Sequence, residues 1–362
     1  MITLNIIFPY DISDISAARN RICSYINILK YKYNINVITF SYNKEIPNIK
    51  NVNFYMINPI RITKKNFLKR AIQEILISYK LIKYSQKFQA DYTLITIPSM
   101  FLLPLGLLLK NKKIVDVRDI QWEYLSNGLI KRILKKIMMY AIRKYNNVIV
   151  TNNFEYKYFE KYGIKSLIIY NGIEERKFNK IISLNYSMNK EVTYVGNIGI
   201  AQNVMTLVKV GEELPDIKFN IIGDGVDFEK IKNYIEKNNI KNVNLTGSLK
   251  WDEILTYYKK SKILFAQLKE EFKSAVPSKL YEYASTGLPI IYGGTGEAVN
   301  FINKLENSYV FKSGDYETCK KYIMQLINQN LKISLKNRNY IKNNFIREKN
   351  AQKIINILEN KE

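Results

Sequence analysis

Short apolar runs alternate along the chain with longer segments in which apolar residues recur every three or four positions. In the first half, the short runs predict strands at residues 3–8, 36–40, 52–56, 92–97, 113–117, 147–150 and 166–169. The longer segments predict helices at residues 16–30, 64–89 and 129–144, with a further apolar helix after Pro98. Nearly continuous apolar strands that alternate with helices are typical of a parallel sheet covered on both faces. We therefore expect a Rossmann-like first domain over residues 1–172.

The alternation lapses after residue 172 and then begins again. Residues 173–189 are polar and rich in turn formers, which predicts a linker. Strands are then predicted at residues 192–195, 218–222, 243–246, 263–267 and 289–292. Helices are predicted at residues 203–213, 228–238, 251–260 and 297–304, with another that opens at Pro277 and a helical tail from residue 316, broken near 329–334. The pattern predicts a second Rossmann-like domain over residues 190–344, and hence an α/β fold of two doubly wound domains.

The composition narrows the chemistry. The 362 residues include 56 Lys and Arg against 32 Asp and Glu, and the net charge of +24 favours anionic partners. The absence of His excludes an imidazole base, a His-based metal site and a Ser-His-Asp triad. Cys23 and Cys319 show neither metal nor redox spacing and are compatible with a reducing compartment, so we expect a cytoplasmic protein. No signal peptide is evident, and the longest apolar run, near residues 97–109, is too short to span a bilayer.

Three loops of the second half place glycines between a predicted strand and a predicted helix. They are Gly196–Gln202, Gly223–Gly225 and Gly293–Glu297. The carboxyl ends of strands are where open parallel sheets bind ligands, and glycine lets the backbone approach a phosphate near a helix N-terminus. Each loop alone is equally well explained as an ordinary turn. None matches the dinucleotide fingerprint or a P-loop, but the three together favour a diphosphate ligand.

The segment FKSAVPSKLYEYASTG, residues 272–287, predicts a short helix next to these loops. Pro277 suits its first turn, and Gly287 suits the left-handed position that ends it. Ser278, Lys279 and Glu282 then share one face. Such a helix start can hold a phosphate at its N–H groups and a sugar hydroxyl at the carboxylate. The alternative interpretation is a surface helix with an ordinary Lys–Glu pair.

Four stretches of the second half, YVGNIGIAQN, IIGDG, VPSKLYEYASTGLPII and GGTGEAVNFI, resemble those of a retaining nucleotide-sugar glycosyltransferase of family 4. The most similar subgroup builds bacterial surface polysaccharides such as lipopolysaccharide and capsule, and includes the O-antigen amino-sugar transferases. DVRDIQWEYL and IIYNGIEERKF are also similar to that subgroup. The resemblance implies a GT-B fold, in which two Rossmann-like domains face a cleft and a C-terminal helix, about residues 345–362, crosses back to the first domain. It also implies a hexosyltransferase that uses a UDP- or dTDP-sugar, an N-acetylated amino sugar among the candidates.

Site residues follow from the resemblance position by position. Glu282 matches the second Glu of the family's E-x7-E motif, which holds the ribose, and Ser278 and Lys279 match the positions that meet the diphosphate. Ser274 stands where the first Glu is expected, and Asn197 and Asn203 stand where basic residues often neutralise the diphosphate, so Lys279 is the first candidate for that task. The implied donor-binding set is Gly196, Asn197, Gly199, Gln202, Gly223, Gly225, Ser274, Ser278, Lys279, Glu282, Gly294, Gly296 and Glu297.

The resemblance further implies front-face attack, in which the leaving phosphate takes the acceptor proton and neither a metal nor a cofactor takes part. No D-x-D motif indicates a metal site. Asp119 and Glu123 are the candidates for the acceptor side or for positioning the donor sugar. The alternative is that Asp116, Arg118 and Asp119 form a structural ion pair at a strand end.

Basic and apolar residues share two predicted helices, over residues 64–87 and 129–144. This pattern fits peripheral attachment to an anionic membrane, where a lipid-linked acceptor would be found, but it also fits solvated lysine faces. Two other functions remain as alternatives. A GT-B sugar-nucleotide epimerase shares the fold, although the absence of His counts against it. A nucleic-acid-binding protein would explain the charge, but no recognition motif is present, and we expect no nucleic-acid partner.

Overall fold

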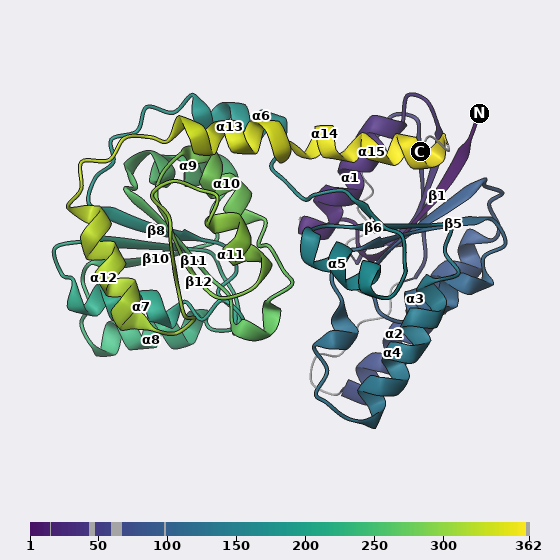
Figure 1. Cartoon of the computed structure of the whole chain (residues 1–362), viewed down its shortest axis with the longest axis horizontal. Helices are drawn as coiled ribbons and strands as arrows, with labels where there is room; N and C mark the ends of the chain where they lie inside the picture. The colour runs from purple at the N-terminus through teal and green to yellow at the C-terminus, as the bar shows by residue number, and fades with distance from the viewer. Residues whose placement is uncertain (15, 43–47, 59–66, 98, 360–362) are drawn as a thin grey trace. The chain divides into compact units, whose positions relative to one another are not determined.

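The computed structural model describes residues 1–14, 16–42, 48–58, 67–97 and 99–359 and divides the chain into two compact units. Unit 1 comprises Met1–Asn171 and Arg347–Glu362, and unit 2 comprises Gly172–Ile346. In each unit a parallel sheet carries helices on both faces (Figure 1). The start of the predicted helix at residues 64–66 and the last three residues of the chain lie outside the described residues.

The sheet of unit 1 has seven parallel strands in the order β3-β2-β1-β4-β5-β6-β7. Strand order reverses beside β1, where Leu4 pairs with Ile35 of β2 on one side and with Tyr92 of β4 on the other. The strands are β1 (Thr3–Asp11), β2 (Asn34–Phe40), β3 (Val52–Met56), β4 (Tyr92–Ile97), β5 (Lys112–Val117), β6 (Asn147–Val150) and β7 (Leu167–Ile168). The main helices are α1 (Ala17–Leu29), α2 (Phe67–Ser85), α3 (Leu102–Leu105), α4 (Leu129–Ile142), α5 (Asn153–Lys161), α14 (Arg347–Ala351) and α15 (Lys353–Leu358).

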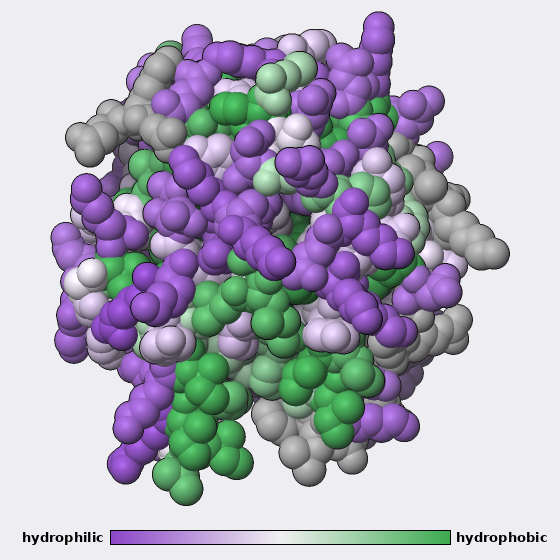
Figure 2. All heavy atoms as spheres, turned by 90° about the vertical axis from the view of Figure 1, so that its right-hand side faces the viewer, coloured by the Kyte–Doolittle hydropathy of each residue, from purple (hydrophilic) through white to green (hydrophobic). Residues whose placement is uncertain are grey.

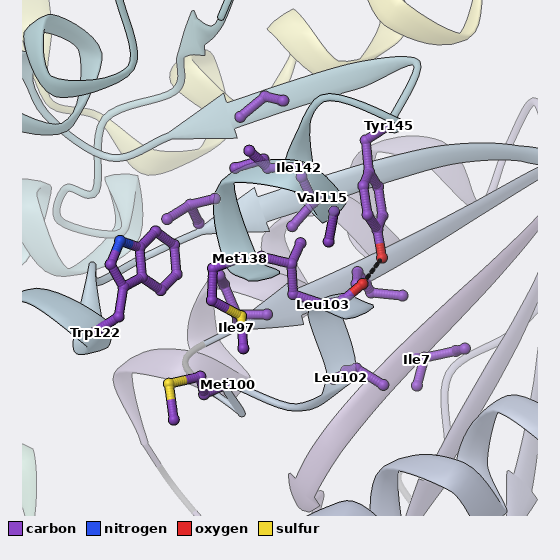
Figure 3. Packing of buried hydrophobic residues seen from close by; sticks show 14 of the residues in the cluster. Ile7, Ile97, Met100, Leu102, Leu103, Val115, Trp122, Met138, Ile142 and Tyr145 are labelled. Atoms are coloured by element: carbon purple, nitrogen blue, oxygen red, sulfur yellow. Dashed lines mark hydrogen bonds between the residues drawn. The ribbon is translucent and has the colours of Figure 1, made fainter. Parts of the chain in front are cut away.

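Apolar side chains fill both faces of this sheet. Helices α2, α3 and α4 cover one face, and α1 with α14 and α15 covers the other. Figure 3 shows the first of these cores, in which the hydroxyl of Tyr145 donates to the carbonyl of Leu103 at 2.7 Å. A Cβ atom on Gly106 would lie 1.9 Å from that hydroxyl, so any other residue there would force the Tyr145 side chain to move. Ala351 and Ile354 of the C-terminal helices join Ile22 of α1 in the second core, which makes the end of the chain part of unit 1.

The sheet of unit 2 has six parallel strands in the order β10-β9-β8-β11-β12-β13. The strands are β8 (Glu191–Val195), β9 (Lys218–Ile222), β10 (Val243–Gly247), β11 (Ile263–Gln267), β12 (Ile290–Gly293) and β13 (Tyr309–Phe311). The helices are α6 (Glu175–Ile182), α7 (Met205–Glu213), α8 (Phe228–Lys237), α9 (Trp251–Lys260), α10 (Lys279–Thr286), α11 (Glu297–Ile302), α12 (Tyr316–Ile327) and α13 (Leu335–Asn344). Strand order reverses here between β8 and β11, so the reversal places the loops after these strands at the usual ligand-binding edge.

Most predicted strands and helices are confirmed, but three elements were not foreseen. The predicted linker 173–189 contains α6, a short amphipathic helix that buries Phe178 and Ile181 and belongs to unit 2. Helix α5 begins where Asn152 caps the backbone N–H of Glu155 at 3.0 Å. Strand β13 is a third unforeseen element. All three are shorter than the window over which hydrophobic periodicity is assessed. Helix α10 begins at Lys279, two residues after Pro277.

No helix among the described residues is long and apolar enough to cross a membrane.

Candidate functional site

The first two glycine loops of unit 2 are bonded to each other at the carboxyl edge of the sheet. The N–H of Gly196 donates to the carbonyl of Ile222 at 2.8 Å, at the ends of β8 and β9. The N–H of Ile198 donates to the carbonyl of Asp224 at 2.8 Å, and the N–H of Asp227 donates back to Ile198 at 3.0 Å. The two predicted loops therefore form one backbone surface.

Glycine is required where backbone segments of this surface meet. Gly223 has φ 142°, and a Cβ atom on it would lie 1.9 Å from the carbonyl oxygen of Gly196. The third loop is fixed in the same way, because a Cβ atom on Gly296 would lie 1.9 Å from the carbonyl oxygen of Lys273. That same oxygen accepts from the N–H of Glu297 at 2.8 Å. The close approaches tie the third loop to the segment that leads into α10.

Lys279, the first residue of α10, brings a buried cation to this edge. Its Nζ atom has no hydrogen-bond partner and lies 3.9 Å from the centre of the Tyr194 ring. A Cβ atom on Gly196 would lie 2.4 Å from that Nζ, so the cation lies directly beside the first loop. Burial lowers the pKa of Lys279 to about 7, although the charge of Glu282 acts to raise it. A buried polar group without a partner is rare in a folded protein and is a candidate ligand contact.

Two buried tyrosines hold the first loop in place. The hydroxyl of Tyr194 donates to the carbonyl of Asn197, and the hydroxyl of Tyr283 accepts from the N–H of Val195 at 2.7 Å. Tyr194 comes from β8 and Tyr283 from α10, which also carries Lys279. Sequence reasoning missed both residues, since a tyrosine in a Tyr-rich chain gives no local sign that it supports a loop.

Glu282 lies one helical turn after Lys279 and is held by α9. Its Oε1 atom accepts from the indole N–H of Trp251 at 3.1 Å and from the hydroxyl of Tyr258 at 2.8 Å. Lys177 of α6 lies 5.0 Å from the centre of the Trp251 ring. The predicted carboxylate thus has two neutral donors fixing its direction, and the simple Lys–Glu surface pair does not describe its contacts.

The other predicted residues of unit 2 lie in the loops at the carboxyl edge of the sheet and at the start of α10. Asn197 donates to Gln202 at 3.1 Å, and Asn300 donates to Glu297 at 3.0 Å. Ser274 is buried, whereas Ser278 is exposed and leaves the N-terminus of α10 without a side-chain cap. Five of the predicted glycines after β8, β9 and β12 have positive φ angles, namely Gly196, Gly223, Gly225, Gly294 and Gly296, whereas Gly199 does not.

In unit 1 the predicted acidic candidates are already bonded. Glu123 accepts from Lys135 at 2.6 Å and from Tyr158 at 2.7 Å, and Lys131 lies 3.5 Å away. Burial alone would raise the pKa of Glu123, but the hydrogen bonds from Lys135 and Tyr158 lower it below its ordinary value. Asp119 accepts from the hydroxyl of Tyr124.

The alternative of an ion pair within residues 116–119 needs a correction. Asp116 is buried and pairs with Arg21 of α1 at 2.7 Å. Arg118 instead lies over the Tyr10 ring, 5.5 Å from its centre, and donates to Thr96 at 3.2 Å. The partner of Asp116 is 95 residues away in sequence, so no local pattern could have identified it.

Within the described part of the chain, no three Cys, Asp or Glu side chains gather closely enough to form a metal site.

Comparison with known proteins matches a family model to the second half of the chain. Residues 175–347 match the family model described as glycosyl transferases group 1. The matched residues cover nearly all of unit 2, including the glycine loops and α10.

Individual relatives are distant. An uncharacterized glycosyltransferase of Methanocaldococcus jannaschii is 25% identical over 219 residues, which cover 56% of this chain and 61% of that protein. The chain thus spans less than two thirds of that relative's length. Sucrose-phosphate synthase of Thermosynechococcus elongatus has a TM-score of 0.80 at 12% identity and covers 99% of both chains. HepE of Anabaena in complex with UDP and glucose has a TM-score of 0.71 at 14% identity, covering 99% of this chain and 100% of that one. The expected α/β class with two Rossmann-like units is confirmed by these likenesses.

Proposed function

We propose that this protein transfers a glycosyl group from a nucleoside diphosphate sugar to a hydroxyl of a saccharide or lipid-linked acceptor. The observation that carries the proposal is the buried, unpartnered ammonium of Lys279 beside the glycine loops of the segment that matches the group 1 family model. The complex of the structurally similar HepE with UDP and glucose supports a UDP-sugar as the first donor to test. Family 4 membership and an amino-sugar donor are further parts of this proposal.

The donor is proposed to lie along the carboxyl edge of unit 2. Its diphosphate accepts hydrogen bonds from backbone N–H groups at the start of α10, where the helix dipole favours an anion. Lys279 supplies the neutralising charge that Asn197 and Asn203 lack. Glu282 accepts from the ribose hydroxyls while Trp251 and Tyr258 hold its direction.

The proposed reaction retains the anomeric configuration. The bond between the anomeric carbon and the diphosphate oxygen breaks, and the acceptor oxygen bonds to the same face of that carbon. The proton of the acceptor hydroxyl passes to the leaving diphosphate, whose growing negative charge is stabilised by Lys279 and backbone N–H groups. This scheme requires neither a metal nor a histidine.

Unit 1 is proposed to meet the acceptor at a membrane surface. Helix α4 exposes a stripe of apolar residues that includes Leu129, 72% exposed, and Ile130, 67% exposed. Figure 2 shows hydrophobic side chains gathered at the lower edge of the face that unit 1 presents. Exposed Arg132 and Lys136 lie on the same helix, and basic residues beside an apolar stripe are suited to an anionic bilayer. Apolar side chains this exposed are not explained by a solvated lysine face. We therefore propose that the protein attaches peripherally to the cytoplasmic side of a membrane. Lys64 and Lys65 of the other predicted basic helix lie outside the described residues.

A thermal-shift screen against nucleotide sugars, followed by a transfer assay with the best ligand, tests the function. A ligand present at 100 times its Kd stabilises the folded protein by about 2.7 kcal/mol, which is measurable as a rise in Tm. We expect one nucleotide sugar to raise the Tm and to release its nucleoside diphosphate when an acceptor is added. No Tm shift with any nucleotide sugar would contradict the proposal, and formation of a free 2-epimer without acceptor would indicate the epimerase.

Glu282→Gln tests the proposed ribose contact more cleanly than Glu282→Ala. Alanine would remove the acceptor of the buried Tyr258 hydroxyl and cost about 1–3 kcal/mol of stability. Glutamine keeps an acceptor oxygen for Tyr258 but removes the charge that strengthens a ribose contact. We expect the donor Kd to rise about tenfold with an unchanged Tm of the free protein. The matched control is Glu229→Gln on α8, which should leave both values unchanged.

A further inference from the structure

Unit 1 contains a groove of about 660 Å³ between the end of β3 and the outer face of α2. Met56 and Ile57 line it from the strand side. Leu76 and Tyr79 line it from α2 and are 48% and 45% exposed. The volume is in the range that holds a small molecule, and the lining is mainly apolar.

Three cations stand along one wall of this groove. Lys80 and Lys83 lie on α2, and Lys87 follows its last residue. The spacing of three and four residues places them on one side of the helical path. Within the described residues, no carboxylate pairs with any of the three, and Lys87 lies 4.9 Å from the centre of the Tyr84 ring. The positive charge of the wall is therefore available to a ligand.

The acidic side chain of α2 does not reduce this charge. Glu74 is the only Asp or Glu of the helix and is bonded to Arg70 at 2.9 Å, one turn closer to its N-terminus. The exposed side of α2 carries apolar residues, including Ile72 and Ile75, beside Lys69 and Arg70 in its first half, and it carries Lys80 and Lys83 in its second half.

We propose that this groove binds a long-chain amphiphile that carries a phosphate next to its chain, with the chain against Met56, Ile57 and Leu76 and the phosphate at Lys80, Lys83 and Lys87. Leu76 and Tyr79 belong both to the groove and to the exposed apolar side of α2, so these two residues join the groove to the surface that would meet a bilayer. The inference rests on the proposed function, since it specifies the lipid-linked acceptor as one that carries a phosphate next to its chain. Lysines bind phosphate well as point charges, whereas an apolar floor offers nothing to a free phosphate.

Isothermal titration with dodecyl phosphate, below its critical micelle concentration, tests the groove on the full chain. Dodecyl maltoside supplies a chain without charge, and inorganic phosphate supplies charge without a chain. We expect dodecyl phosphate to bind at least about tenfold more tightly than either. In Lys80→Gln/Lys83→Gln/Lys87→Gln this affinity should fall about tenfold or more. The control Lys230→Gln/Lys232→Gln/Lys237→Gln removes the same charge from exposed positions of α8 and should bind like the wild type.

Further measurements separate this inference from the proposed function. The lysine variant should keep the nucleotide-sugar Tm shift of the wild type, because that shift reports unit 2. Leu129→Ser/Ile130→Ser/Ile133→Ser on α4 should lose binding to anionic vesicles but keep binding to dodecyl phosphate. Equal binding of dodecyl phosphate to the wild type and the lysine variant would overturn the groove while leaving the donor site standing. Binding of inorganic phosphate as tight as that of dodecyl phosphate would also overturn it.

Discussion

The two units share one architecture, but a buried cation is paired in unit 1 and unpaired in unit 2. In unit 1 the guanidinium of Arg21 is buried and donates to the carboxylate of Asp116, to the carbonyl of Ile169 and to the side chain of Asn171. In unit 2 the ammonium of Lys279 is equally enclosed but has no acceptor at all. A buried charge that is hydrogen-bonded within the protein has a structural role. A buried charge without a partner costs stability, which is a reason to expect that a ligand supplies the missing hydrogen bond.

The largest effect should come from breaking the satisfied pair. Asp116→Ala leaves the buried Arg21 charge uncompensated, and we expect unit 1 to lose about 3–5 kcal/mol. Because the chain has two units, hydrogen exchange resolved by peptide is the suitable measurement, with faster exchange in β1, β4 and β5 and unchanged exchange in β8 and β9. The double variant Arg21→Met/Asp116→Leu removes both charges and should recover much of the loss. Exchange that accelerates equally in both units would show that the pair is not a local support of unit 1.

Removing the unpaired charge of Lys279 should have the opposite effect on stability. Lys279→Met removes a cation proposed to contact the diphosphate, and a hydrogen bond between charged groups contributes about 1.5–3 kcal/mol, so we expect a donor Kd about 100-fold higher. The free protein should become more stable, because the cost of burying the ammonium disappears. Titration calorimetry and thermal unfolding measure the two effects. Lys230→Met on α8 is the matched control and should change neither.

A variant that loses stability together with donor affinity would show that Lys279 has a structural role.

Much of this contrast could not be predicted from the sequence, for physical reasons. Local patterns identified the strands, because parallel strands buried on both faces are nearly continuous apolar runs, and they placed the glycine loops because glycine marks close backbone approaches. The pairing of Arg21 with Asp116 and the position of Lys279 over Tyr194 join residues far apart in sequence. Helix α6 was predicted as part of a linker because two helical turns are shorter than the window over which periodicity is assessed, even though its apolar residues share one face.

The unpaired charge of Lys279 should also make donor binding depend on pH, which is a smaller effect than those of the two substitutions. Burial lowers the pKa of Lys279 to about 7 from 10.5, so below about pH 7 the ammonium is charged in both the folded and the unfolded chain, and its burial cost is fully present. The cost disappears as the pH rises from about 7 toward 10.5, because only the unfolded chain then keeps the proton. A bound diphosphate restores the proton, so above pH 7 binding should take up a proton and weaken by up to about tenfold per pH unit.

Calorimetry in buffers of different ionisation enthalpy at pH 8 measures the proton uptake directly. A nucleotide sugar is the suitable ligand, because its diphosphate has no ionisation of its own in this range. Lys279→Met should show a flat profile from pH 6 to 9. A wild-type affinity that is equally flat would mean that the donor does not contact this ammonium.

The smallest effect is expected at Glu123, where the sequence and the structure point to different roles. As a residue that touches the reacting groups it would need a free carboxylate, but the carboxylate is bonded to Lys135 and Tyr158 and lies near Lys131. Hydrogen bonds lower its pKa, so its contribution to stability is present above the ordinary Glu pKa and is lost as the pH falls through the lowered value. Glu123→Gln should therefore cost about 1 kcal/mol at pH 7, with the difference from the wild type shrinking toward pH 3, and should leave the transfer rate within about twofold. Denaturant unfolding at the two pH values, beside a transfer assay, distinguishes the roles. A transfer rate that falls more than about a hundredfold with unchanged stability would show that Glu123 takes part in the reaction and that its two lysines are placed for catalysis.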